Sequence, residues 1–145
     1  ENGKERGDYE IIFSRKLDVD RIEVAENLHQ NRLIPYLKNE DRLALDDPRV
    51  PNAGMFLETA KARRIGVGRK GEAAYLTVDL ADFPNVNMWT PEGMPFVCIE
   101  PMVGHHDQID ASYEISEKPC VVSLAPGKTG RYRFTMTVNE AVAGP

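Results

Sequence analysis

The chain has 145 residues, of which 41% are hydrophobic and 28% are charged, which is enough for one globular domain with a hydrophobic core. Its formal net charge is −5 with acidic and basic residues interspersed, and without a lysine and arginine cluster we expect no nucleic-acid partner. The apolar runs are far too short to cross a bilayer and no signal-peptide pattern is visible, so we expect no membrane partner either.

The first fifty residues contain one clear strand and one ambiguous stretch. Residues 9–13 place apolar side chains at alternate positions, which predicts a strand. Residues 19–24 alternate in the same way, but residues 25–28 also fit a helical turn, so the stretch 17–35 stays undecided. Two prolines within residues 46–52 predict a loop, because proline cannot sit in a central strand.

Short strands separated by glycine, proline and asparagine turns dominate the rest of the chain. They are predicted at residues 55–57, 65–67, 75–80, 86–89, 96–100, 120–124 and 131–138. Helical periodicity is weak throughout. The pattern therefore predicts an all-β fold, specifically an antiparallel β-sandwich.

The run from Phe96 to Glu100 is flanked by prolines and ends in a carboxylate. Side chains alternate across a strand, so Cys98 and Glu100 share a face with Phe96, while Val97 and Ile99 face the other way. A carboxylate at the end of an apolar face reaches solvent or a neighbouring Lys or Arg, or it is placed for proton transfer. The residues alone leave both interpretations open, and Glu100 is a candidate catalytic residue.

Several short motifs in a fixed order carry a resemblance to a known family. They lie at residues 85–90, 95–101, 117–119 and 124–127. Together they resemble the C-terminal half of the aldose 1-epimerase (galactose mutarotase) family, in its LacX-like branch. The resemblance implies a galactose mutarotase-like supersandwich, of which residues 1–145 form the C-terminal part of a single domain whose N-terminal half is absent.

The resemblance also implies an activity and a role for Glu100. The implied enzyme is an aldose 1-epimerase-type isomerase that interconverts the α and β anomers of a free hexose by general acid and base ring opening, without a cofactor. Glu100 stands where the family places the base that takes the C1 hydroxyl proton. The family's acid, a His, lies upstream, outside this chain, so we expect activity in the full-length protein and an inactive isolated chain.

Three further residues are candidates for binding the sugar. Asn52 and Arg63 occupy positions that correspond to a family Asp and to a Lys-Ser-Arg stretch, and Asn52 fits a plain turn residue equally well. Trp89 can pack its ring against the C–H face of a pyranose, although a lone Trp at a strand end also fits the core.

The three histidines are not matched by the family's pattern. His105 and His106 follow the Glu100 strand and offer metal ligands together with Asp107, but neighbouring residues on an extended chain face opposite ways. We expect no bound metal and interpret these residues as solvated loop histidines. His29 matches no family motif.

Two cysteines, Cys98 and Cys120, are too few for a disulfide framework. We expect no disulfide, a buried Cys98 thiol and a reducing, cytoplasmic setting. Lys118 aligns with a family lysine and is predicted to form a surface salt bridge.

Two other functions stay open. The chain could be a non-catalytic carbohydrate-binding or sensing module on the same fold, or a structural fragment without a site. For the isomerase and for the binding module alike, the expected partner is a small-molecule sugar, an aldohexose. The identity of the sugar or sugar phosphate, and whether the chain forms a homodimer, stay open as well.

Overall fold

The structure is a computed structural model that describes residues 5–50, 55–58, 62–91 and 94–139, with the backbone alone at 55–58. Its elements are η1 (Arg6–Asp8), β1 (Tyr9–Ala25), β2 (Leu28–Ala44), β3 (Met55–Glu58), β4 (Arg64–Arg69), β5 (Ala74–Asp79), β6 (Asn85–Trp89), β7 (Cys98–Met102), η2 (Ile115–Glu117) and β8 (Thr135–Val138). All paired strands run antiparallel, which confirms the predicted fold class. No helix in these ranges is long and apolar enough to span a membrane.

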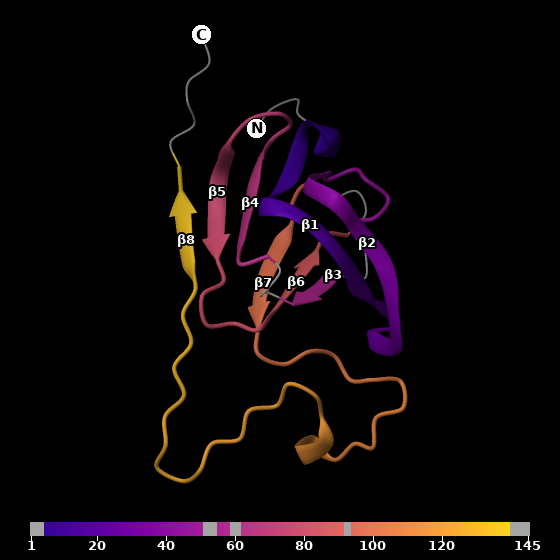
Figure 1. The fold of residues 1–145 in the computed structure, drawn as a ribbon, viewed down its shortest axis with the longest axis vertical. Coiled ribbons are helices and arrows are strands. Elements are labelled where there is room, and N and C mark those ends of the chain that lie inside the picture. The colour runs from indigo at the N-terminus through magenta and orange to yellow at the C-terminus, as the bar shows by residue number, and fades with distance from the viewer. Residues whose placement is uncertain (1–4, 51–54, 59–61, 92–93, 140–145) are drawn as a thin grey trace.

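The long strand β1 joins two wings of one sheet. The strand order is β7-β6-β3-β1-β4-β5-β8, and β2 pairs with β1 as a side branch (Figure 1). The N-terminal end of β1 pairs with β4, from Tyr9 to Phe13, whereas Ile22 near its C-terminal end pairs with β3. We call β4, β5 and β8 the first wing, and β3, β6 and β7 the second wing.

A tight turn settles the ambiguous stretch in favour of strand. Glu26 and Asn27 have φ angles of 52° and 63°, and they connect β1 to β2 directly at the Ala25–Leu28 pair. Two consecutive residues with positive φ are the requirement of a type I′ hairpin turn, whose twist matches that of paired strands. Residues 25–28 therefore close a hairpin instead of starting a helical turn.

Both wings pack against one hydrophobic core. Several buried side chains make up this core: Ile65 and Val78 come from the first wing, Val86 and Met88 from the second wing, and Leu37 from β2. A single sheet can bury one apolar face only by folding over it or by meeting a second layer. Here the sheet folds over its own apolar face, because the β1–β2 pair between the two wings is strongly bent (Figure 1).

One predicted strand, at residues 96–100, is shifted along the sequence in the structure. Strand β7 begins at Cys98 and continues through Pro101 to Met102, so the second proline lies inside the strand. Proline is tolerated there because β7 is at the end of the described strand order. Val97 precedes the strand, yet Val97 and Ile99 pack against the core as predicted.

The C-terminal part of the chain forms less strand than its sequence predicts. Residues 120–124 are irregular and exposed, and the last strand covers Thr135–Val138 instead of 131–138. A strand exists only through hydrogen bonds to a neighbour, and residues 120–134 pair with no strand in the described part of the chain. The alternation of apolar and polar residues in these segments is therefore not enough to form a strand.

Candidate active site

Glu100 is held by a buried amide. It lies opposite Asn87 in the β6–β7 pair, and Asn87 Nδ2 donates a hydrogen bond of 2.6 Å to Glu100 Oε2. The Asn87 side chain is 7% exposed, whereas Glu100 is exposed. Among the ion pairs of the described residues, none joins a Lys or Arg to Glu100. The carboxylate is thus oriented by a neutral donor, which bonds to one of its two oxygens.

Trp89 lies on the same face as Glu100. It pairs with Cys98, two residues before Glu100, so Trp89 and Glu100 are diagonal neighbours whose Cα atoms are separated by about 7–8 Å. Its ring contacts that of Phe96 at a centroid distance of 5.9 Å. Thr90 is fully buried and its hydroxyl donates to the Phe96 carbonyl at 2.6 Å, which fixes the connection between β6 and β7.

Cys98 differs from the expected buried thiol. It is half-buried, because strand alternation places it on the Glu100 face and not on the core face. Partial burial and the nearby Glu100 carboxylate raise the pKa of this thiol. Cys98 and Cys120 are both free cysteines.

The structure does not bring Arg63 to Glu100. Arg63 precedes β4 in the first wing and its exposed guanidinium pairs with Asp79 at 3.4 Å, whereas Glu100 and Trp89 belong to the second wing. Asn52 lies outside the described residues. Of the predicted site residues, Glu100 and Trp89 alone are brought together in the described ranges.

The three histidines form a cluster next to the end of β7. The ring centroids of His29 and His105 are 4.5 Å apart, and those of His29 and His106 are 5.7 Å apart. His29 is 2% exposed, and burial, with the cationic forms of its neighbours, lowers its pKa to about 4. The expectation of solvated loop histidines is therefore wrong, since His105 and His106 are half-buried against His29.

Hydrogen bonds explain why the histidines gather. The backbone of His29 bonds to the backbone of Asp107 and Ile109 at 2.9 Å each, which ties the start of β2 to the segment after β7. Asp107 also pairs with Lys118 at 2.6 Å, which confirms the predicted salt bridge of that lysine. No three His, Cys, Asp or Glu side chains within the described residues are arranged to hold a metal ion.

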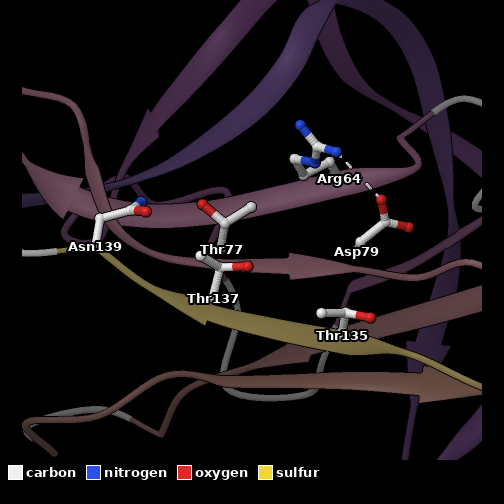
Figure 2. Close-up of a pocket in the computed structure, with 6 residues that line it drawn as sticks. All are labelled: Arg64, Thr77, Asp79, Thr135, Thr137 and Asn139. Carbon is white, nitrogen blue, oxygen red and sulfur yellow. Dashed lines mark hydrogen bonds and ion pairs between the residues drawn. The ribbon is translucent and has the colours of Figure 1, made fainter.

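A polar hollow of about 400 Å³ lies on the first wing. Figure 2 shows its lining on β4, β5 and β8: Arg64, Thr77, Asp79, Thr135, Thr137 and Asn139. Arg64 pairs with Asp79 at 3.3 Å. The backbone N–H of Ala81, aided by the arginines, lowers the pKa of Asp79, so this carboxylate stays ionised. The lining offers hydroxyl, amide and charged groups, which suit a ligand rich in hydroxyl groups.

Comparisons with known proteins agree with the fold. No protein-family model matches the chain. The plasmid and chromosomal LacX proteins of Lactococcus lactis subsp. lactis are 25% identical to it over 143 residues, which cover 94% of this chain and 47% of each relative. A galactose mutarotase related enzyme from Lactobacillus acidophilus superposes with a TM-score of 0.79 at 22% identity, covering 97% of this chain and 49% of that chain.

The chain is thus similar to the LacX proteins in sequence and to galactose mutarotase-related proteins in fold. A galactose mutarotase-like protein from Lactobacillus casei also shares the fold, with a TM-score of 0.69 at 19% identity, covering 90% of this chain and 44% of that chain. The chain spans about half the length of the curated relatives it matches.

Asn87 is a residue of the candidate site that the sequence pattern did not single out. Asn87 was part of a motif, but no role was assigned to it. A signal was present, because Asn85 and Asn87 alternate with Val86 and Met88 in a strand that is buried on both faces. Buried amides need partners, and Asn85 bonds to the Val103 carbonyl at 3.2 Å in the same way that Asn87 bonds to Glu100.

Proposed function

We propose that the chain carries the base of a sugar 1-epimerase site, with Glu100 acting on the C1 hydroxyl of a free aldohexose. The observation that carries this proposal is the Asn87–Glu100 hydrogen bond, which fixes an exposed carboxylate beside an aromatic ring. A positioned base of this kind contributes about 10²–10⁴-fold to a rate.

The proposed reaction needs a base and an acid on opposite sides of the sugar ring. Glu100 removes the proton of the C1 hydroxyl, the bond between C1 and the ring oxygen breaks, and an acid gives a proton to that oxygen. Rotation about C1–C2 and closure of the ring in the reverse sequence produce the other anomer and return both protons. The sugar is neither oxidised nor reduced.

His29 is poorly suited to supply the acid. It is buried, and its pKa of about 4 leaves its ring neutral near pH 7, so it is not a cationic proton donor at that pH. We therefore keep the hypothesis that the acid belongs to a polypeptide that corresponds to the other half of the relatives.

Trp89 supports a sugar ligand at this position. Its half-buried ring shares the Glu100 face, and an aromatic ring packs well against the C–H groups of a pyranose. Fluorescence of this single tryptophan gives a direct test. We expect glucose or galactose to change the emission of the wild-type chain in a saturable way, while an equal concentration of glycerol does not. The absence of a saturable change with either sugar would contradict the proposed site.

A second candidate function is carbohydrate binding without turnover. The polar hollow on the first wing favours it, because threonine hydroxyls and an Arg–Asp pair line a space of about 400 Å³ away from Glu100. The substitution Thr137→Val removes a hydroxyl from this hollow. If Thr137→Val weakens sugar binding and Glu100→Gln does not, the result supports a binding site at the hollow and contradicts one at Glu100.

A further inference from the structure

The three histidines join two segments that are far apart in the sequence. His29 is the second residue of β2, whereas His105 and His106 belong to residues 103–110, which follow β7 and which we call the connecting segment. In Figure 1 the orange trace after β7 passes beside the turn that joins β1 to β2. The contact between this segment and β2 therefore fixes where the chain runs after the strand that carries Glu100.

Two backbone hydrogen bonds at one residue of β2 hold the connecting segment. His29 donates its N–H to the Asp107 carbonyl, and Ile109 donates its N–H to the His29 carbonyl, at 2.9 Å each. An exposed side-chain bond of 2.6 Å from Asn31 to Asp110 supports them. A contact with so few hydrogen bonds can open locally while the paired strands of the core stay closed.

The histidine rings pack on one another at this contact. The His29 ring is tilted by 31° against that of His105 at a centroid distance of 4.5 Å, and the ring of His106 meets it nearly at a right angle at 5.7 Å. His29 is 2% exposed, and the other two residues are half-buried. Neutral imidazole rings can be buried in this way, but burial disfavours the charged imidazolium because it loses contact with water.

The positive charge around the cluster also opposes its protonation. Burial is the main cause of the low pKa of His29, and the cationic forms of His105 and His106 and the Lys118 ammonium lower it further. The Asp107 carboxylate lies in the same place, but it already pairs with Lys118 at 2.6 Å. Each proton that the cluster takes up therefore adds repulsion between its members.

The carboxylates on the other sides of the cluster are engaged as well. On β1, the residue opposite His29 is the apolar Val24, and the neighbouring Glu23 pairs with Arg32. At the end of the connecting segment, Asp110 accepts the side-chain bond from β2 that is described above. These carboxylates already have partners, so they do little to offset the charge of protonated histidines.

We propose that the three histidines form a pH-sensitive latch, which holds the connecting segment against β2 while the rings are neutral and releases it when they take up protons. Release brings His29 into water and separates it from His105 and His106, so its ring carries a proton at lower cost. The two backbone bonds at His29 break in the same step, while the core strands stay paired. The chain after β7 is thus fixed at neutral pH and loose in mild acid. This property does not depend on the activity proposed for Glu100.

Amide hydrogen exchange of the 145-residue chain, measured by NMR at pH 7 and pH 5, tests the latch. Release exposes the N–H groups of His29 and Ile109, so their protection factors report how often the segment opens. A His29 pKa of about 4 in the closed state and about 6.5 in the open state makes opening about twentyfold more favourable at pH 5 than at pH 7. We expect protection of these two amides to fall by that factor. The N–H of Leu45, which bonds to the Tyr9 carbonyl at the opposite end of the β1–β2 hairpin, is the reference, and its protection should fall far less.

Variants separate the latch from a general effect of acid. His29→Gln keeps a polar side chain that does not titrate in this range, so protection of Ile109 should lose most of its pH dependence. If this variant does not fold, His105→Gln at a half-buried residue gives the same comparison, with a smaller fall than in the wild type. Lys70→Gln, which removes an exposed positive charge in the β4–β5 turn, should keep the wild-type fall.

Three results would overturn the proposal. Equal falls in protection at Ile109 and Leu45 would show that acid unfolds the whole chain. Unchanged protection of Ile109 in the wild-type chain would show that the segment is not released. A full twentyfold fall in the folded histidine variant would show that the histidines do not control the release.

Discussion

Asn87 and Glu100 face each other across the β6–β7 pair, and the hydrogen bond between their side chains is 2.6 Å long. The donor is 7% exposed and lies on a strand whose opposite face is in the core. The orientation of Glu100 thus depends on strand register and on core packing. A base must stay within hydrogen-bond reach of the proton that it removes, so this relationship is the basis of the following predictions.

The substitution Glu100→Gln should remove the base with little change of shape. Gln keeps one acceptor oxygen for Asn87 but cannot take a proton near neutral pH. In the complete enzyme we expect a fall of about 10²-fold or more in the rate of anomer exchange. That fall corresponds to about 3 kcal/mol of barrier. Polarimetry on freshly dissolved α-glucose or α-galactose measures the rate, with Glu72→Gln in the β4–β5 turn as the control. An unchanged rate in Glu100→Gln would exclude Glu100 as the base.

The substitution Asn87→Asp should change how the activity depends on pH. It replaces the donor that orients Glu100 with a second carboxylate, and two adjacent negative charges favour proton uptake by the pair. We expect the midpoint on the acid side of the pH–rate profile to move upward by about one unit. Asn27→Asp, in the exposed β1–β2 turn, should leave the profile in place. A lower rate without any movement of the midpoint would show that Asn87 has a structural role alone.

His29 should make the fold less stable as the pH falls. Its pKa is about 4 in the folded chain against an ordinary value of 6.5, so the unfolded state binds the proton more readily. The free energy of unfolding should be unaffected by His29 above pH 6.5, decrease as the pH falls toward 4, and lose at most about 3 kcal/mol in total. Urea titrations at a series of pH values test this against His29→Gln, whose stability should fall less over the same range. Equal slopes for the two proteins would contradict the prediction.

Met88 should stabilise the strand that carries the site. It is fully buried on the core face of β6, between Asn87 and Trp89 in the sequence. Met88→Ala should cost about 2–5 kcal/mol of stability, because it removes apolar contacts and leaves a cavity. Met94→Ala, at a residue that is 46% exposed, should change stability by about 0.5 kcal/mol or less. Chemical denaturation measures both values, and a similar small effect for the two variants would contradict the packing described for β6.

Local sequence patterns predicted the strands whose two faces differ in polarity. Residues 75–80 and 86–89 were predicted as strands, and β5 and β6 occupy Ala74–Asp79 and Asn85–Trp89. The same reasoning failed at residues 120–124, where the alternation is present but no neighbouring strand is described. Alternation determines which face a residue would occupy in a strand, but a strand forms only with a partner.

For the site, the sequence by itself determined that Glu100 shares a strand face with Cys98, because that depends on alternation alone. The position of Trp89 on the same face depends on the register between β6 and β7. Only the tertiary structure decided that Asn87 bonds to Glu100, that Arg63 lies in the other wing, and that three histidines meet. Those contacts depend on strand register and on the order of strands in the sheet. Both are set by the burial of the whole apolar face, and residues distant in the sequence contribute to that burial.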